Sequence, residues 1–230
     1  MRYLSGTGIR FDGEVLNSED QFALPTGLEL STVEFAHLFS IFDGSRVHQQ
    51  AEKATSRDDA PPGMYFTVVN NKLIQKQHKN RSGLFEEELG VPELFIQGLH
   101  IDHFFLNEHE SPVGLGTIAF ALCAITAHLA RLGKISLIAA GGVGYDSRHI
   151  GFKIWPRFGF NAKLLPSEVQ NTPHLSQCQT VLDVLAVDQL WWDEHGSQRL
   201  MTFDLAAGSA SWRKLIDYLS RNERAGGQHA

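Results

Sequence analysis

The sequence ELFIQGLHIDHFFL at residues 93–106 is followed by SPVGLGT at 111–117 and by KISLIAA at 134–140. The first and the last of these stretches are rich in branched and aromatic side chains and predict strands. Residues 118–132 between them are almost continuously apolar and end at Gly133, which predicts a buried helix with a glycine C-cap. Strand, helix and strand within about fifty residues predict a crossover unit in one sheet.

Weaker patterns outside this unit predict the remaining elements. A capping-box pattern, Ser31 with Glu34, opens a helix with phenylalanines at helical spacing. The expected elements are short strands and turns at 1–30, a helix from 31 to 42, a loop at 45–63, strands at 64–70 and 72–78, a strand at 160–168, a helix at 174–194, a strand at 199–205, a helix at 209–222 and a disordered tail at 225–230.

Together these elements predict one α/β domain over residues 1–224. Its central sheet is expected to be mixed, mostly antiparallel and flanked by helices. The expected parts are a variable N-terminal part at 1–90, a core at 91–166, and an extension formed by the helix 174–194 with the last strand and helix, 199–222.

Composition excludes several classes of function. The 230 residues carry 20 basic and 26 acidic side chains, a net charge of −6, so we expect no nucleic acid as a partner. The two cysteines, Cys123 and Cys178, form neither a disulfide framework nor a thiolate metal site. The most apolar segment, 118–132, is shorter than the roughly 20 residues that cross a bilayer, and no targeting segment is visible. We therefore expect a cytoplasmic protein without membrane contact.

The glycine turn before the central helix is a candidate anion site. A helix N-terminus presents unpaired backbone amides, and Gly114 and Gly116 would let a phosphate approach them. A dinucleotide fingerprint is a distant alternative, because it needs an acidic residue about 20 positions on, and none follows until Asp146. A glycine turn without any ligand is the third interpretation.

Two motifs resemble the Gcn5-related N-acetyltransferase (GNAT) superfamily. Ser111-x-x-Gly114-x-Gly116 is similar to the pyrophosphate loop of that family, and IWPRFGF at 154–160 looks like the segment that joins its fourth helix to its sixth strand. The resemblance covers residues 90–166. It implies an acetyl-coenzyme A (acetyl-CoA) dependent N-acetyltransferase that acts on a small-molecule or protein amine, and it allows a homodimer.

The resemblance also implies which residues bind the coenzyme. The strands at 100–106 and 134–140 would bond the pantetheine, and Arg148 would approach a phosphate, although an exposed arginine without this role is an alternative. The pyrophosphate would be held by the backbone amides of Val113, Gly114, Leu115, Gly116 and Thr117, with the hydroxyl of Thr117 as a further donor.

Among the departures from the family pattern, two concern the phosphate loop and the general acid. Ser111 stands where the family has a longer polar side chain. Trp155 occupies the position where the family has the tyrosine that protonates the leaving thiolate. An indole N–H cannot serve as that acid. Tyr145 is the substitute candidate, with a surface tyrosine as the alternative. A catalytically silent coenzyme-binding or protein-interaction module is therefore the second interpretation.

The densest group of titratable residues lies on the strand 93–106. Alternation places His100 and Asp102 on one face of the strand and His103 on the other, which is a poor arrangement for metal ligands, and we predict no metal. His100 is the candidate general base, with Asp102 to orient or replace it. A hydrogen-bonded histidine within a sheet is the alternative.

Overall fold

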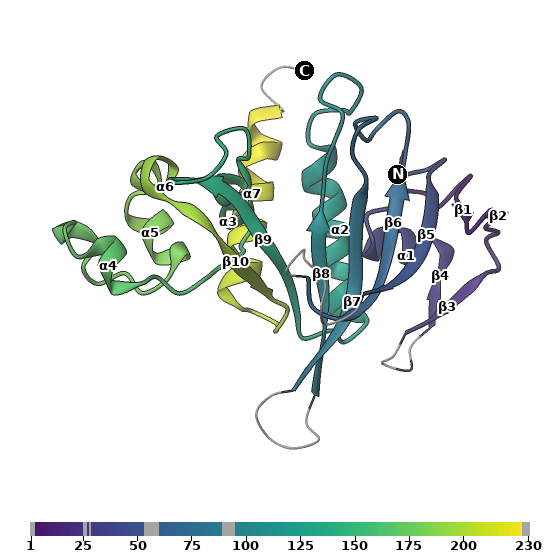
Figure 1. Ribbon diagram of the computed structural model, residues 1–230, viewed down its shortest axis with the longest axis horizontal. Coiled ribbons are helices and arrows are strands. Elements are labelled where there is room, and N and C mark those ends of the chain that lie inside the picture. Colours follow the sequence, from purple (N-terminus) through teal and green to yellow (C-terminus); the bar gives the residue numbers. More distant parts are fainter. Residues whose placement is uncertain (1–2, 25–26, 28, 53–59, 89–94, 227–230) are drawn as a thin grey trace. The chain divides into compact units, whose positions relative to one another are not determined.

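A computed structural model describes residues 3–24, 27, 29–52, 60–88 and 95–226. The chain divides into two compact units, Met1–Ile135 and Ser136–Ala230, which are described in turn (Figure 1). This division into compact units does not test the prediction of a single domain over 1–224, which stays a prediction. Among the described residues, no helix is both long and apolar enough to pass through a bilayer.

The first unit is built on a large sheet with the strand order β8-β7-β6-β5-β1-β2. Strand β1 is parallel to β5, whereas the other pairs from β5 to β8 and the pair β1 and β2 are antiparallel. The strands are β1 (Arg10–Phe11), β2 (Glu14–Val15), β5 (Arg46–Glu52), β6 (Gly63–Val69), β7 (Asn80–Glu88) and β8 (Phe95–His103).

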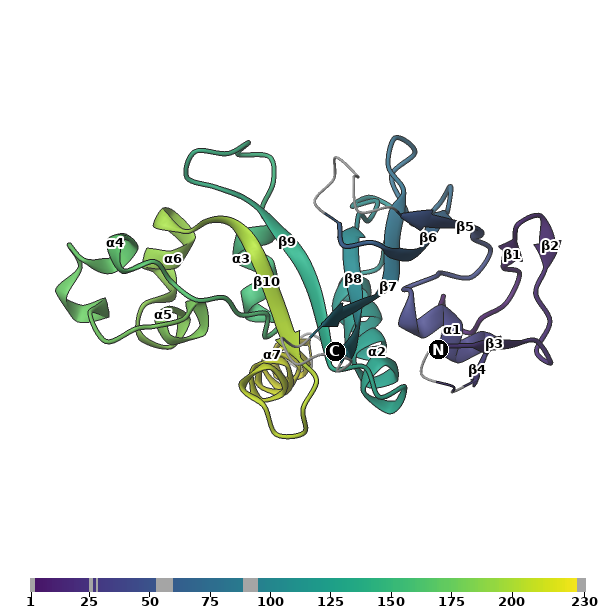
Figure 2. The same ribbon diagram turned by 60° about the horizontal axis from the view of Figure 1, so that its bottom comes forward.

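Two helices cover one face of this sheet. Helix α1 (Thr32–Leu38) packs against helix α2 (Leu115–Leu129), and both lie on the same side of the strands (Figures 1 and 2). Strands β3 (Gln21–Ala23) and β4 (Glu29–Ser31) form a separate antiparallel pair. Ser31 accepts a hydrogen bond from the amide of Glu34 and completes the capping box predicted for α1.

The second unit combines two strands with several helices. Strand β9 (Lys134–Gly142), whose first two residues belong to the first unit, neighbours β10 (Ser197–Asp204). Helices α3 and α7 both contact β10. The helical segments are α3 (Gly151–Arg157), α4 (Pro166–Val169), a 3-10 turn (Pro173–Leu175), α5 (Val181–Val187), α6 (Gln189–His195) and α7 (Ala210–Gly226).

The fold is therefore α/β, with a large mixed, mostly antiparallel sheet flanked by helices, as the sequence predicts. The predicted helix after the glycine turn, the strand at 134–140 and the last strand and helix are confirmed as α2, β9, β10 and α7. A specific correspondence to the acetyltransferase superfamily stays a prediction.

Two predictions in the N-terminal half are wrong. The polar residues 45–63 contain strand β5, which pairs with β6 over its full length while Val47 points into the core. The predicted strand 72–78 consists of turns, because the side chain of Asn70 accepts hydrogen bonds from the amides of Lys72 and Leu73. Hydrophobic periodicity predicts neither a strand with mostly polar side chains nor a turn with apolar ones.

Three predictions in the C-terminal half are also wrong. Residues 160–168 contain only isolated bridges at Asn161 and Lys163 before α4 begins at Pro166. The single helix 174–194 is broken, because Asp188 ends α5 and its carboxylate accepts the amide of Trp191 as the cap of α6. The predicted tail begins too early, since α7 continues to Gly226; the remainder, 227–230, lies outside the described residues.

The core of the first unit includes a group of phenylalanine rings around Phe35. Its ring centroid lies 3.9 Å from that of Phe22, 5.1 Å from those of Phe39 and Phe66, and 5.9 Å from that of Phe11. Phe35 is fully buried. Because rings from three strands and from the C-cap of α1 meet on this side chain, it joins the helix to both sheets of the unit.

We expect Phe35→Ala to lower the free energy of unfolding by about 3–5 kcal/mol, because it leaves a cavity between these rings. Urea unfolding followed by circular dichroism measures this change. Val33→Ala on the same helix is the control, since Val33 is exposed. A loss no larger than that of the control would contradict the central position of Phe35.

Candidate functional site

Gly114, the N-cap residue of helix α2, has a left-handed backbone conformation. Its φ is 80°, a value that glycine adopts without strain. A Cβ atom added to Gly114 would meet nothing within 4 Å, so open space lies in front of the turn. The neighbouring Val113 is fully exposed. The turn therefore presents its backbone, and not a wall of side chains, to whatever approaches it.

Most backbone amides of this turn have no hydrogen-bond acceptor in the part of the chain that the structure describes. The amide of Leu115 donates to the Pro112 carbonyl at 3.1 Å, and that of Ile118 donates to Gly114 at 3.0 Å. Such orphan amides, with the positive end of the helix dipole, are the physical basis of an anion site. Within the described ranges, the amides of Val113, Gly114, Gly116 and Thr117 donate no hydrogen bond.

Gly116 and Ser111 serve the packing of the turn. A Cβ on Gly116 would lie 3.1 Å from Cδ1 of Leu106 and 3.6 Å from Cε1 of Phe104, so glycine lets the segment after β8 approach α2 closely. The Ser111 hydroxyl donates to the carbonyl of Leu73 at 3.2 Å. The side chain at the first position of the motif therefore anchors the loop.

A β-bulge brings charged groups together where β7 pairs with β8. Arg81 pairs with His103 and Ser82 with Ile101, which leaves Asp102 as the extra residue. The Asp102 carboxylate accepts a hydrogen bond from Nη1 of Arg81 at 2.5 Å and lies 2.9 Å from Nδ1 of His103. Burial would raise the pKa of Asp102, but these hydrogen bonds from His103 and Arg81 prevail and lower it.

His100 lies inside the sheet. It pairs with Gly83, and the Tyr65 ring occupies the space that a Gly83 side chain would fill. The rings of Tyr65 and His100 are 6.4 Å apart. His100 is only 1% exposed, and burial lowers its pKa to about 4. The negative charge of Asp102 acts in the opposite direction and raises this pKa, but burial has the larger effect. The imidazole is thus neutral at neutral pH and is separated from solvent.

His103 is the residue that alternation did not single out. Its side chain is 47% exposed, whereas that of Asp102 is 7% exposed. The prediction that His103 lies away from Asp102 is wrong, because the bulge interrupts the alternation by one residue. No sequence signal marks this bulge; a mismatch in length between the facing segments appears only once the register is known.

The remaining predicted residues lie in the second unit, in the loop between β9 and α3. Tyr145 is exposed, and its amide donates to the Gly142 carbonyl at 3.0 Å. Arg148 is exposed and forms hydrogen bonds to both carboxylate oxygens of Asp146. Trp155 lies in α3, with its ring 5.9 Å from Phe158 and 5.3 Å from Phe160.

The described part of the chain contains no group of three or more His, Cys, Asp or Glu side chains arranged to hold a metal ion. Cys123 is buried, and burial raises the pKa of its thiol to about 12. Its thiol donates to the carbonyl of Leu38 at 3.1 Å. Cys123 is therefore a packing residue and not a thiolate nucleophile.

The comparisons with known proteins identify no relative: no family model matches the chain, and neither a curated protein nor a solved structure matches it.

The buried His100 predicts a loss of stability in weak acid. Its pKa is about 4 in the folded protein and 6.5 in its ordinary state, so between these values the unfolded chain binds the proton first and falling pH favours unfolding. Between pH 7 and 4 we expect the wild type to lose about 3 kcal/mol more than His100→Gln. Urea titrations at several pH values measure the difference.

His109→Gln is the control for this experiment, because it makes the same change at an exposed histidine. Equal pH dependence in the wild type and in His100→Gln would mean that folding does not lower the pKa of His100.

Proposed function

We propose that the chain transfers an acyl group from acyl-coenzyme A to an amine. The observation that carries the proposal is the exposed glycine turn before α2, whose amides of Val113, Gly114, Gly116 and Thr117 have no acceptor within the described ranges. The turn has the spacing of the pyrophosphate loop that the sequence resembles. It also begins a helix of 15 residues, long enough for its dipole to favour an anion.

The turn fits a pyrophosphate that is bound mainly by backbone groups. Open space in front of Gly114 leaves room for phosphate oxygens, and the hydroxyl of Thr117 adds a donor. Ser111 is occupied with Leu73, so a long polar side chain at this position is missing. When bound, the coenzyme supplies an acyl group activated as a thioester. The chain itself must orient the amine and accept its proton.

The geometry favours His103 over His100 as the group that accepts this proton. An Nδ1–H that donates to Asp102 leaves Nε2 of His103 with the lone pair that a general base needs. Arg81 keeps the carboxylate ionised, and the carboxylate in turn holds the ring. His100, expected from the sequence as the base, is buried beneath Tyr65, which keeps it from touching a substrate.

Tyr145 is the proposed general acid. Its phenol is exposed and can donate a proton to a bound ligand. Arg148, proposed to approach a phosphate, is paired with Asp146 and would exchange one anion for another. The bonding of the pantetheine by residues 100–106 and 134–140 also stays a prediction.

A second candidate function is a coenzyme-binding or protein-interaction module without catalysis. Trp155 favours it, because this side chain replaces the expected tyrosine and packs against Phe158 and Phe160. Binding of the coenzyme without release of free thiol in the presence of amines would select this candidate.

Gly114→Glu tests the coenzyme site. The carboxylate would fill the open space in front of the turn and repel a phosphate, so we expect calorimetry with acetyl-CoA to detect no binding to this variant. Gly13→Glu is a matched control, since Gly13 also has positive φ and a Cβ there would meet nothing within 4 Å. Equal affinity of both variants would place the ligand elsewhere, and a wild type without affinity for acetyl-CoA would overturn the proposal.

His103→Gln tests the proposed base. Loss of a general base lowers turnover about 100-fold or more, and we expect this loss with an unchanged affinity for acetyl-CoA. Release of free thiol with a panel of amines measures turnover, and its pH profile should lose the acidic limb. His109→Gln is the control. Turnover within threefold of the control would remove His103 from the mechanism without affecting the coenzyme site.

A further inference from the structure

The second unit contains an open surface cavity of about 450 Å³. This volume lies in the range of about 300–1,000 Å³ that is typical of small-molecule sites. All of its lining residues come from the loop after β9, from the region of α4, from α6 and from the start of β10. They are Val143, Glu168, Thr172, Trp191, Trp192, His195 and Ser197.

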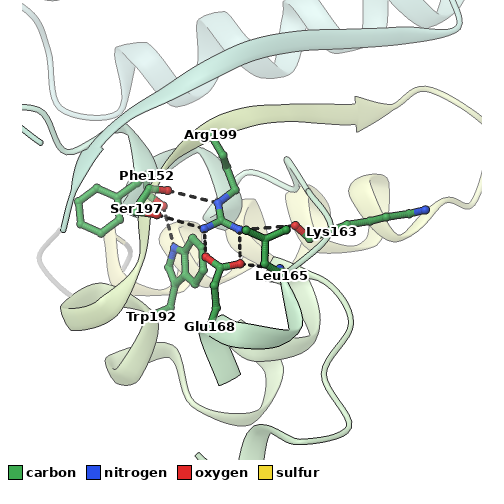
Figure 3. A network of polar contacts seen from close by, with 7 residues as sticks. All are labelled: Phe152, Lys163, Leu165, Glu168, Trp192, Ser197 and Arg199. Carbon is green, nitrogen blue, oxygen red and sulfur yellow. Dashed lines mark hydrogen bonds and ion pairs between the residues drawn. The ribbon is translucent and has the colours of Figure 1, made fainter. Parts of the chain in front are cut away.

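Aromatic side chains of α6 form much of the cavity wall. Trp191 is half-buried, and its ring lies 5.0 Å from that of His195 with 49° between the planes. Trp192 is buried, and its indole N–H donates to the Phe152 carbonyl at 2.9 Å (Figure 3). The helix carrying both tryptophans is fixed at its start by the Asp188 cap. The cavity therefore has an aromatic wall on a helix whose start is held by the Asp188 cap.

The charges at the cavity cancel. Among the seven lining residues, Glu168 alone carries a permanent charge, and Figure 3 shows it paired with Arg199. Nη1 and Nη2 of Arg199 donate to the two carboxylate oxygens, and the amide of Leu165 donates to Oε2 at 2.7 Å. The guanidinium also lies over the Trp192 ring, 5.0 Å from its centroid. Because Glu168 and Arg199 neutralise each other, neither side chain offers an unpaired charge to an ionic ligand.

Two hydroxyls add polar character to the aromatic wall. The Ser197 hydroxyl already accepts a hydrogen bond from Nη2 of Arg199 at 3.2 Å. The Thr172 hydroxyl has no partner in the part of the chain that the structure describes, and the Thr172 amide is fixed to the Val169 carbonyl at 2.9 Å. Thr172 therefore offers the hydrogen bond that a ligand can use to fix its orientation.

We propose that this cavity binds a flat, uncharged aromatic or heteroaromatic ring. The ring stacks against Trp191 and exchanges a hydrogen bond with the Thr172 hydroxyl. Stacking supplies affinity in a site with aromatic walls, and the internally neutral pair of Glu168 and Arg199 disfavours ionic ligands. The proposal does not depend on acyl transfer, because no lining residue belongs to the glycine turn.

A matched series of ligands tests the proposal: indole, the cation tryptamine and the anion indole-3-acetate. Saturation-transfer NMR and calorimetry should show that indole binds more tightly than both charged analogues. Trp191→Leu should weaken indole binding about tenfold, since it removes the stacking surface. The control is Leu190→Ala on the same helix, because Leu190 is exposed and does not line the cavity.

Thr172→Val gives a second test that preserves side-chain shape. It should weaken indole binding about fivefold by removing the hydrogen bond to the ring N–H. This variant decides the matter if Trp191→Leu does not fold. Absence of indole binding, tighter binding of either charged analogue, or unchanged affinity in Thr172→Val and in a folded Trp191→Leu would overturn the proposal.

Discussion

The pairing of β7 with β8 determines where the polar groups of the first unit meet. The two strands run antiparallel from Glu88 opposite Phe95 to Arg81 opposite His103, and a single extra residue, Asp102, interrupts the register near the end. Because side chains alternate along a strand, one inserted residue reverses the faces of everything beyond it. His103 is thereby brought to the carboxylate of Asp102, and Arg81 is held opposite both.

The glycines near α2 act for different physical reasons, although the sequence presents them as one motif. Gly114 has a left-handed conformation and faces open space, as a backbone anion site requires. Gly116 lies against Phe104 and Leu106, where any side chain would separate the helix from the segment that follows β8. Phe104 and Leu106 directly follow β8, the strand that carries His103. The packing at Gly116 therefore holds the end of β8 against the start of α2.

The cavity of the second unit exists because a helix expected to be continuous is not. Asp188 ends α5 and caps α6 with the amide of Trp191, and this change of direction brings both tryptophans of α6 toward Glu168. The bonds of Arg199 and Trp192 then hold the surrounding segments together. The apolar pattern through residues 181–192 does not predict the break, since both short helices bury side chains at helical spacing.

The sequence by itself determined the α/β class, the helix after the glycine turn, the strand at 134–140 and the C-terminal strand and helix, because their apolar periodicity or glycine punctuation is local. The sequence also singled out His100 and Asp102, because titratable residues are most closely spaced on this strand. Only the tertiary structure decided that His100 is enclosed beneath Tyr65, that Asp102 orients His103, and that residues 45–63 include a strand. These outcomes depend on strand register, which is set by contacts between distant segments and has no local signature.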